Sequence, residues 1–145
     1  MQISSPAFAA TGRIPSAFTC DGQNTPPPLD ISDVPPAVAG LVLIVDDPDS
    51  PFGTWQHWLV WNLPPDTSHL ALPLPDSAVT GQNDFGQAAY IGPCPHGGLH
   101  HYHFRLFALD SSLNLPPGSS RAQLDRAMTG HIIGQADLVG VYSRP

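Results

Sequence analysis

The sequence contains no glutamate and no lysine, so its 12 acidic residues are all aspartate and its 5 basic residues are all arginine. The absence of lysine excludes a Schiff-base mechanism and a phosphate-loop lysine, and the absence of glutamate excludes a Glu general acid. Both residues are also common helix formers, whereas 18 prolines and 13 glycines interrupt this chain. We therefore expect a mostly β structure with many turns and no long helix.

Long apolar segments are also missing. The longest apolar run, residues 38–45, is too short to span a bilayer. The first 15 residues have neither the basic start nor the apolar stretch of a signal peptide. We therefore expect a cytoplasmic protein without stable membrane insertion. A length of 145 residues suits a single domain over residues 1–145.

Positive charge is scarce in this chain. The formal net charge is -7, and the 5 arginines form no run. Proteins that follow a nucleic-acid backbone carry clustered lysine and arginine. Nucleic acid is therefore not an expected partner.

The only two cysteines, Cys20 and Cys94, lie far apart in the sequence. They fit neither a metal-ligand spacing nor a dense disulfide framework. The favoured interpretation is two partly buried thiols. A single bridge is the alternative, and it requires a geometry that a sequence does not supply.

Three apolar segments predict buried strands. Residues 40–46 form a continuous aliphatic run that is typical of a central strand buried on both faces. Residues 55–63, which include His57, and residues 99–109 predict two more strands. Prolines limit the first two segments, and a Gly- and Pro-rich loop precedes the third. The polar residues 64–86 form a long connection that could cover a sheet edge.

One short helix is expected near the C-terminus. Ser120 and Gln123 form a capping-box pattern, and a shared apolar face follows at Leu124, Ala127 and Met128. Gly130 or Gly134 would end this helix, and residues 136–143 alternate as a final strand does.

Strand periodicity decides which polar side chains of residues 99–107 can meet. His100 and Tyr102 face one side of the strand, whereas His101 and Arg105 face the other. His100 and Tyr102 can therefore line one pocket together.

Asp47 and Asp49 lie on a proline-stiffened loop directly after the first buried strand. Two carboxyl groups with separated pKa values could do acid-base work. Alternatively, these side chains accept hydrogen bonds from backbone N–H groups of the turn. The sequence leaves both interpretations open.

Neither a metal site nor a nucleophile emerges from residue spacing. His101 and His103 share a strand face without a cysteine or carboxylate at ligand spacing, so no metal or other cofactor is expected. Cys94 lies two residues before His96, but its flanking prolines deny it a neighbouring amide donor. The chain contains no G-x-S-x-G motif.

Taken alone, His57 among three tryptophans is typical of a core histidine. The combination is more informative, because two proline-stiffened loops each adjoin a buried strand that carries a histidine. Such an arrangement predicts one small polar cavity.

Several ordered motifs resemble those of the phosphatidylethanolamine-binding protein family, also called Raf kinase inhibitor-like proteins, in its short prokaryotic branch. These motifs are FTCDG at 18–22, DPDSP at 47–51, HWLVWNLP at 57–64, NDFG at 83–86, GPCPHGGLHHYHFRLFALD at 92–110 and LVGVYSR at 138–144. The resemblance implies an all-β-dominated fold with a large central antiparallel sheet, a smaller second sheet and a short helix near the C-terminus.

The resemblance also implies a small pocket for phosphate and other anions. Its ligand-binding positions fall on Asp47, His57, Gly92, Pro93, His100 and Tyr102, with Asp49 and Trp55 in support. The chain differs from the family pattern at His101, where arginine is frequent, and at His96, where a second proline is common. It also lacks the insertions and the extra C-terminal helix of eukaryotic members.

Without lysine, the ligand's charge has to be met by other donors. We expect His57 and His100, partly or wholly protonated, to do so, together with N–H groups of the Gly92 loop and the Tyr102 hydroxyl. Asp47 is expected to orient a histidine and to favour its protonated form. Phosphate affinity should then fall between about pH 6 and pH 8, as imidazolium is lost.

The leading functional hypothesis is the binding of small anionic or phosphorylated ligands, such as a phospholipid head group, without catalysis. One alternative is a kinase or protease inhibitor that docks a protein partner on the pocket rim. Another is a hydrolase that uses Asp47, His57 and His100 as acid-base groups. The sequence does not decide between a monomer and a homodimer.

Overall fold

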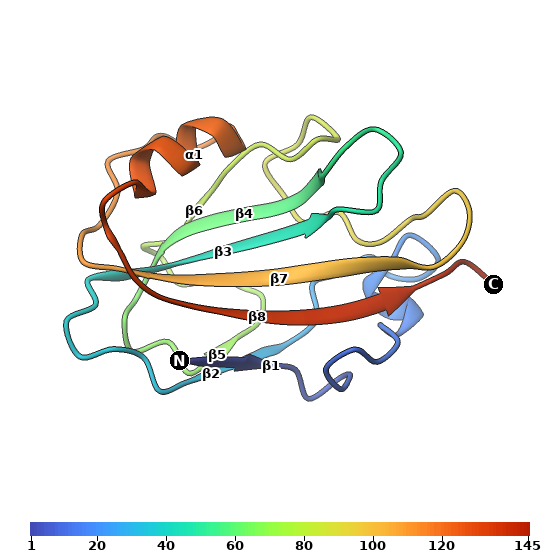
Figure 1. The fold of residues 1–145 in the computed structure, drawn as a ribbon, viewed down its shortest axis with the longest axis horizontal. Coiled ribbons are helices and arrows are strands. Elements are labelled where there is room, and N and C mark those ends of the chain that lie inside the picture. The colour runs from blue at the N-terminus through green and yellow to red at the C-terminus, as the bar shows by residue number, and fades with distance from the viewer.

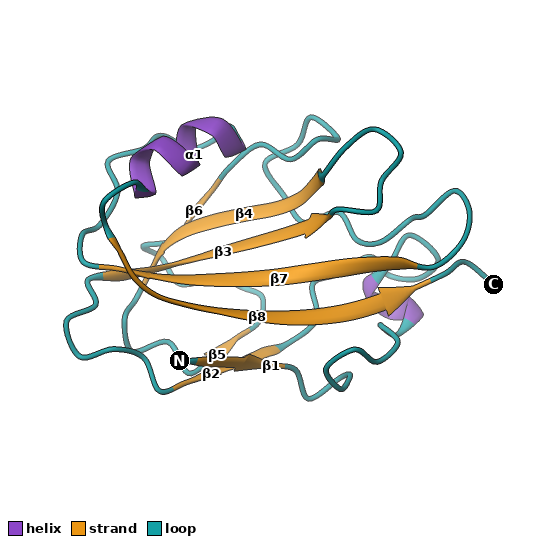
Figure 2. Ribbon diagram, in the orientation of Figure 1, coloured by secondary structure: helices purple, strands orange, loops and turns teal.

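A computed structural model describes all 145 residues as two antiparallel β-sheets with one α-helix (Figures 1 and 2). The larger sheet has five strands in the order β6-β4-β3-β7-β8, and the smaller has three in the order β1-β2-β5. The predicted fold class is therefore confirmed. The elements in chain order are β1 (Gln2–Ser4), the 3-10 helix η1 (Ser16–Phe18), β2 (Leu29–Ser32), β3 (Gly40–Asp47), β4 (Trp55–Leu63), β5 (His69–Leu70), β6 (Val79–Thr80), β7 (His100–Leu109), α1 (Arg121–Met128) and β8 (Ile132–Tyr142).

Strand β3 lies at the centre of the larger sheet and is buried along its whole length. Leu41, Leu43 and Val45 join a hydrophobic cluster that also contains residues of the smaller sheet. Val42 and Ile44 point to the opposite face, where a second cluster contains the buried residues of α1. The prediction of a central strand buried on both faces is confirmed, because alternate side chains fill two different cores.

Helix α1 begins as its sequence predicts. The Ser120 hydroxyl accepts from the backbone N–H of Gln123, and the Gln123 side-chain oxygen accepts from the backbone N–H of Ser120. These two bonds complete the capping box. The helix ends at Met128, two residues before Gly130, whose φ of 83° lies in the left-handed region.

The last strand starts four residues earlier than expected, at Ile132, because its first half is largely exposed and shows no apolar alternation. Residues 64–86 contribute one short strand to each sheet: β5 pairs with β2 in the smaller sheet, and β6 lines the β4 edge of the larger one.

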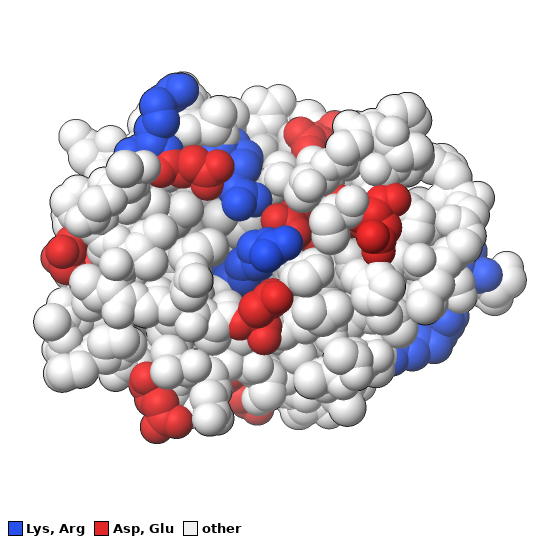
Figure 3. Space-filling model, in the orientation of Figure 1, with Lys and Arg blue, Asp and Glu red and all other residues white.

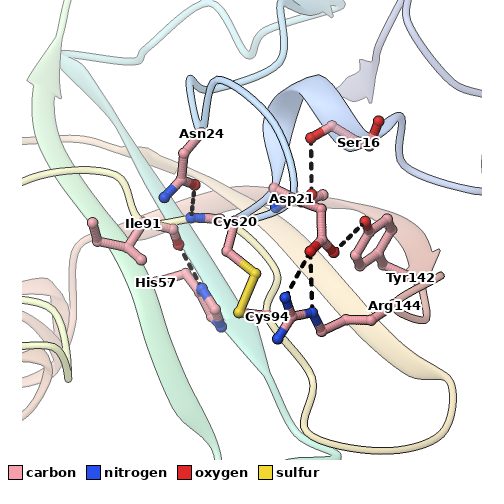
Figure 4. Close-up of a disulfide and its surroundings, with 11 residues drawn as sticks. Ser16, Cys20, Asp21, Asn24, His57, Ile91, Cys94, Tyr142 and Arg144 are labelled. Atoms are coloured by element: carbon pink, nitrogen blue, oxygen red, sulfur yellow. Dashed lines mark hydrogen bonds and ion pairs between the residues drawn. A yellow bond between two sulfur atoms is a disulfide. The ribbon is translucent and has the colours of Figure 1, made fainter.

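Cys20 and Cys94 form a disulfide, so the interpretation of two free thiols was wrong. The bond joins the segment after η1 to the loop before β7 (Figure 4). The two segments also meet through the backbone, where the Cys20 N–H donates to the Pro93 carbonyl at 3.1 Å. Proximity of this kind depends on the tertiary fold rather than on sequence spacing.

The helix-bearing face of the larger sheet holds an ionic cluster around Asp46, whose side chain is almost fully buried. Its carboxylate accepts from Arg105 Nε at 2.9 Å and Nη2 at 3.1 Å, and from Arg121 Nη1 at 3.2 Å. Figure 3 shows charged groups of both signs side by side on the face that carries β7 and β8. Arg105 points away from His100, as strand periodicity predicted. Arg105 and Arg121 therefore both lie on the face of the sheet that carries Asp46.

None of the helices has the length and apolar character needed to cross a membrane.

Candidate functional site

A cavity of about 370 Å³ lies where β3, β4 and β7 meet two loops. One loop joins β3 to β4, and the other precedes β7. Six of the eight residues selected from the sequence line this cavity, whereas Gly92 and Pro93 do not. The lining residues are Asp47, Asp49, Ser50, Pro51, Phe52, Trp55, His57, Phe85, Cys94, Pro95, His96, Gly97, His100 and Tyr102.

His57 reaches the cavity through an irregularity in β4. In the pairing of β3 with β4, Val45 faces Trp58 and Asp46 faces Gln56, so His57 has no partner and forms a β-bulge. Its ring centroid lies 5.4 Å from that of Tyr102 on β7. A bulge of this kind re-aims a side chain, and such bulges are common beside functional sites.

The His57 ring is fixed by one hydrogen bond to the main chain. Its Nδ1 lies 2.5 Å from the carbonyl oxygen of Ile91, and Figure 4 shows the ring turned toward that carbonyl. A carbonyl oxygen only accepts, so Nδ1 carries a proton. Burial lowers the pKa of His57 below its usual value, more strongly than the bond to Ile91 and nearby aspartates raise it, which disfavours the protonated form that was expected from the sequence.

This buried histidine should make stability depend on pH. An unfolded histidine titrates near pH 6.5, so the unfolded chain binds a proton there that folded His57 does not bind. The unfolding free energy should therefore fall as the pH drops below about 6.5, by up to about 1.4 kcal/mol per pH unit from this residue. Urea unfolding of the native chain and of His57→Gln between pH 7 and pH 5 measures the contribution, because other acidic groups act equally in both proteins. Parallel curves would contradict it.

His100 and Asp47 form a largely buried pair in the cavity wall. His100 Nδ1 lies 2.6 Å from Asp47 Oδ2, and both side chains are largely buried. The other oxygen of Asp47 accepts from the Asp49 N–H at 2.8 Å. Asp47 thus accepts a backbone hydrogen bond within the turn, which is one of the two interpretations that the sequence left open, and it also orients the His100 imidazole.

Asp49 binds His101, the residue after His100, through its carboxylate. Its Oδ2 accepts from the His101 N–H at 2.8 Å and from His101 Nδ1 at 2.7 Å. These bonds hold the pKa of the Asp49 carboxyl below its usual value, so it stays ionised at the edge of the cavity.

Tyr102 supplies a fixed hydroxyl. Its ring is buried between those of His57 and His100, at centroid distances of 5.4 and 6.3 Å. Burial raises the pKa of the phenol, with Asp47 and Asp49 adding to the effect, so the group remains protonated and able to donate.

Gly92 has a different role from the one expected of it. Its N–H donates to Asn24 Oδ1 at 2.8 Å, so this amide is not free for a ligand. A Cβ at this position would lie 2.1 Å from the Phe18 carbonyl oxygen. Gly92 therefore allows two backbone segments to approach closely, two residues before the disulfide-bonded Cys94.

A row of three aromatic rings extends from His57 to the protein surface. Of these, only Trp55 was selected from the sequence. Phe85 packs edge-on against both His57 and Trp55, at 5.4 and 5.7 Å, and Phe52 follows Trp55 at 6.0 Å. Phe52 is 76% exposed. Phe52 follows two prolines in the loop between β3 and β4, and this sequence context did not predict that its ring would line the cavity.

Comparison with known proteins agrees with this arrangement. A sequence model of the phosphatidylethanolamine-binding protein family matches residues 4–143. The chain belongs to that family. An UPF0098 protein of Methanothermobacter thermautotrophicus is 48% identical, with 99% of each chain covered. An UPF0098 protein of Chlamydia trachomatis is 44% identical, again with 99% of each chain covered.

Two crystal structures show the same family fold. A phosphatidylethanolamine-binding protein homolog from Chlamydia trachomatis superposes with a TM-score of 0.95 at 43% identity, covering 99% of this chain and 97% of the other. Escherichia coli YbcL, a member of the mammalian family, gives a TM-score of 0.92 at 30% identity, covering 99% and 98%. The resemblance inferred from the motifs is therefore confirmed.

Proposed function

We propose that this protein binds small phosphate-bearing anions in the cavity formed by His57, His100 and Tyr102. One observation carries the proposal: each imidazole uses Nδ1 within the protein, and neither Nε2 nor the Tyr102 hydroxyl has a protein partner. Three polar groups from two strands are thus fixed in place and available to one ligand. Membership of a ligand-binding family supports the same conclusion.

The cavity's charge limits what it can hold. Two aspartates line it and no arginine does, and Arg105 and Arg121 pair with Asp46 on the other face of the sheet. Bulk positive charge therefore does not attract the ligand. Recognition depends on directed hydrogen bonds to a few oxygen atoms, which suits a compact tetrahedral group better than an extended polyanion.

Replacing His100 by glutamine should weaken binding of inorganic phosphate about tenfold or more, since the Nε2 position and the contact with Asp47 are both lost. Titration by NMR at pH 6.5 measures this loss. The matched control is His69→Gln, because His69 also pairs through Nδ1 with an aspartate, at 2.7 Å, but lies in the smaller sheet. Equal affinities in both variants, or no phosphate binding by the native chain, would overturn the proposal.

A second function rests on the exposed side chains around the cavity mouth. Phe52 and Leu99, which is 53% exposed, present apolar surface on the two loops that border the cavity. Such a rim could dock a kinase or protease whose phosphorylated or carboxylate-bearing segment enters the cavity. A partner retained by the native protein and released by His100→Ala would support inhibition of this kind.

The hydrolase alternative has one supporting feature, the Asp47–His100 pair, which resembles the orienting half of an acid-base catalyst. Turnover of a phosphate or acyl ester that disappears in His57→Ala would support it.

Cytoplasmic location stays part of the proposal, as the sequence predicted. Disulfides persist in oxidising compartments and are rare in the cytoplasm of most organisms. A cytoplasmic location therefore requires a cytoplasm in which the Cys20–Cys94 bond stays oxidised.

A further inference from the structure

His57 offers the cavity a hydrogen-bond acceptor rather than a donor. Its Nδ1 donates to the Ile91 carbonyl, which fixes the tautomer of the neutral ring. The remaining nitrogen, Nε2, then carries a lone pair. Only a second proton on this buried ring would make Nε2 a donor.

The surroundings of His57 do not supply a strong reason to add that proton. The charged groups that act on it are Asp47 and Asp46 at the end of β3 and Asp84 in the loop after β6. The adjoining rings of Phe85 and Tyr102 are uncharged. Burial outweighs the three carboxylates, so the pKa of His57 stays below its usual value.

A fully ionised oxyanion fits such a site poorly. All of its outer oxygens are acceptors, so one of them would face the lone pair of His57 Nε2 without a hydrogen between them. The carboxylates of Asp47 and Asp49 add further negative charge along the same wall. An anion that carries one proton avoids the conflict, because its O–H can donate to Nε2 while its other oxygens accept from Tyr102.

We propose that the cavity selects protonated anions, namely the monoanions of phosphomonoesters and of inorganic phosphate. In the bound state, the O–H group of the anion donates a hydrogen bond to His57 Nε2. This specificity rests on the proposed function. It makes His57 the residue that distinguishes a phosphomonoester from a sulfate ester or a phosphodiester, neither of which carries an acidic proton near neutral pH.

Methyl phosphate and methyl sulfate provide the test. At pH 5.5 methyl phosphate is largely a monoanion, since the second pKa of a phosphomonoester is about 6. Methyl sulfate has the same shape and the same single charge but no proton. We expect calorimetry with the native protein to show methyl phosphate binding at least about tenfold more tightly. Its affinity should fall about tenfold per pH unit well above pH 6, as the monoanion disappears.

Each outcome of this comparison decides something. Equal affinities for the two ligands would overturn the inference but leave the phosphate-binding cavity in place, because protonated His57 could then hold either anion. Binding of neither ligand, together with no binding of inorganic phosphate, would overturn the proposed function itself.

Two variants separate His57 from the rest of the cavity. In His57→Ala the preference for methyl phosphate over methyl sulfate should shrink toward one, because the acceptor is gone. In Tyr102→Phe both affinities should fall while their ratio persists, since only a shared donor is lost. A preference that survives His57→Ala unchanged would assign the discrimination to another group and overturn the role given to His57.

Discussion

Replacing Cys20 and Cys94 together by alanine is expected to lower the free energy of unfolding by about 4 kcal/mol. The disulfide joins residues 74 positions apart, so it restricts a large part of the unfolded chain. Breaking it releases that restriction, and the unfolded state gains conformational entropy. Urea unfolding of the oxidised protein and of the double variant measures the difference.

The reduced native protein is the control for this experiment. It keeps both sulfur atoms and loses only the covalent link, so its unfolding free energy should match that of the double variant. If both proteins lost less than about 1 kcal/mol of unfolding free energy, this prediction would be wrong. Residual structure in the unfolded chain would then already keep the two segments close together without the disulfide.

Alanine at position 92 is expected to cost about 3 kcal/mol of stability, although it adds a single methyl group. That methyl group would lie 2.1 Å from the Phe18 carbonyl oxygen and 2.8 Å from Asn24 Oδ1. Relief requires the two backbone segments to separate, which also breaks the hydrogen bond from the Gly92 N–H to Asn24. Thermal and urea unfolding would both show the loss.

Gly97→Ala provides the matched control five residues later in the same loop. A Cβ on Gly97 meets no atom within 4 Å, and its φ lies outside the left-handed region. We expect this change to stay within about 0.5 kcal/mol of the native value. If the two alanine variants were equally stable, close approach at Gly92 would not be a determinant of the fold.

Patterns with a local physical cause were predictable from the sequence. The aliphatic run of β3 requires burial on both faces, and the Ser120 and Gln123 pair satisfies free amides at a helix start. Strand periodicity correctly placed His100 and Tyr102 on one face, because β7 pairs with β8 without a shift from His100 to Ala108.

Features that depend on the packing of distant segments were not predictable. Strict alternation would put His57 on the same face as Leu59 and Trp61, beneath α1, and the bulge that turns it to the cavity has no signature in the sequence. The Cys20–Cys94 bond and the contact between Gly92 and Phe18 arise only once two segments have met in three dimensions.

Trp55 has a further significance, because it differs in position from the other two tryptophans. Trp58 and Trp61 are buried in the two hydrophobic clusters, whereas Trp55 lies in the cavity wall between Phe52 and Phe85. An occupant of the cavity therefore changes the polarity around one indole of three and leaves the other two undisturbed. The protein carries its own optical probe of occupancy, with an internal reference for its emission, and needs no attached dye.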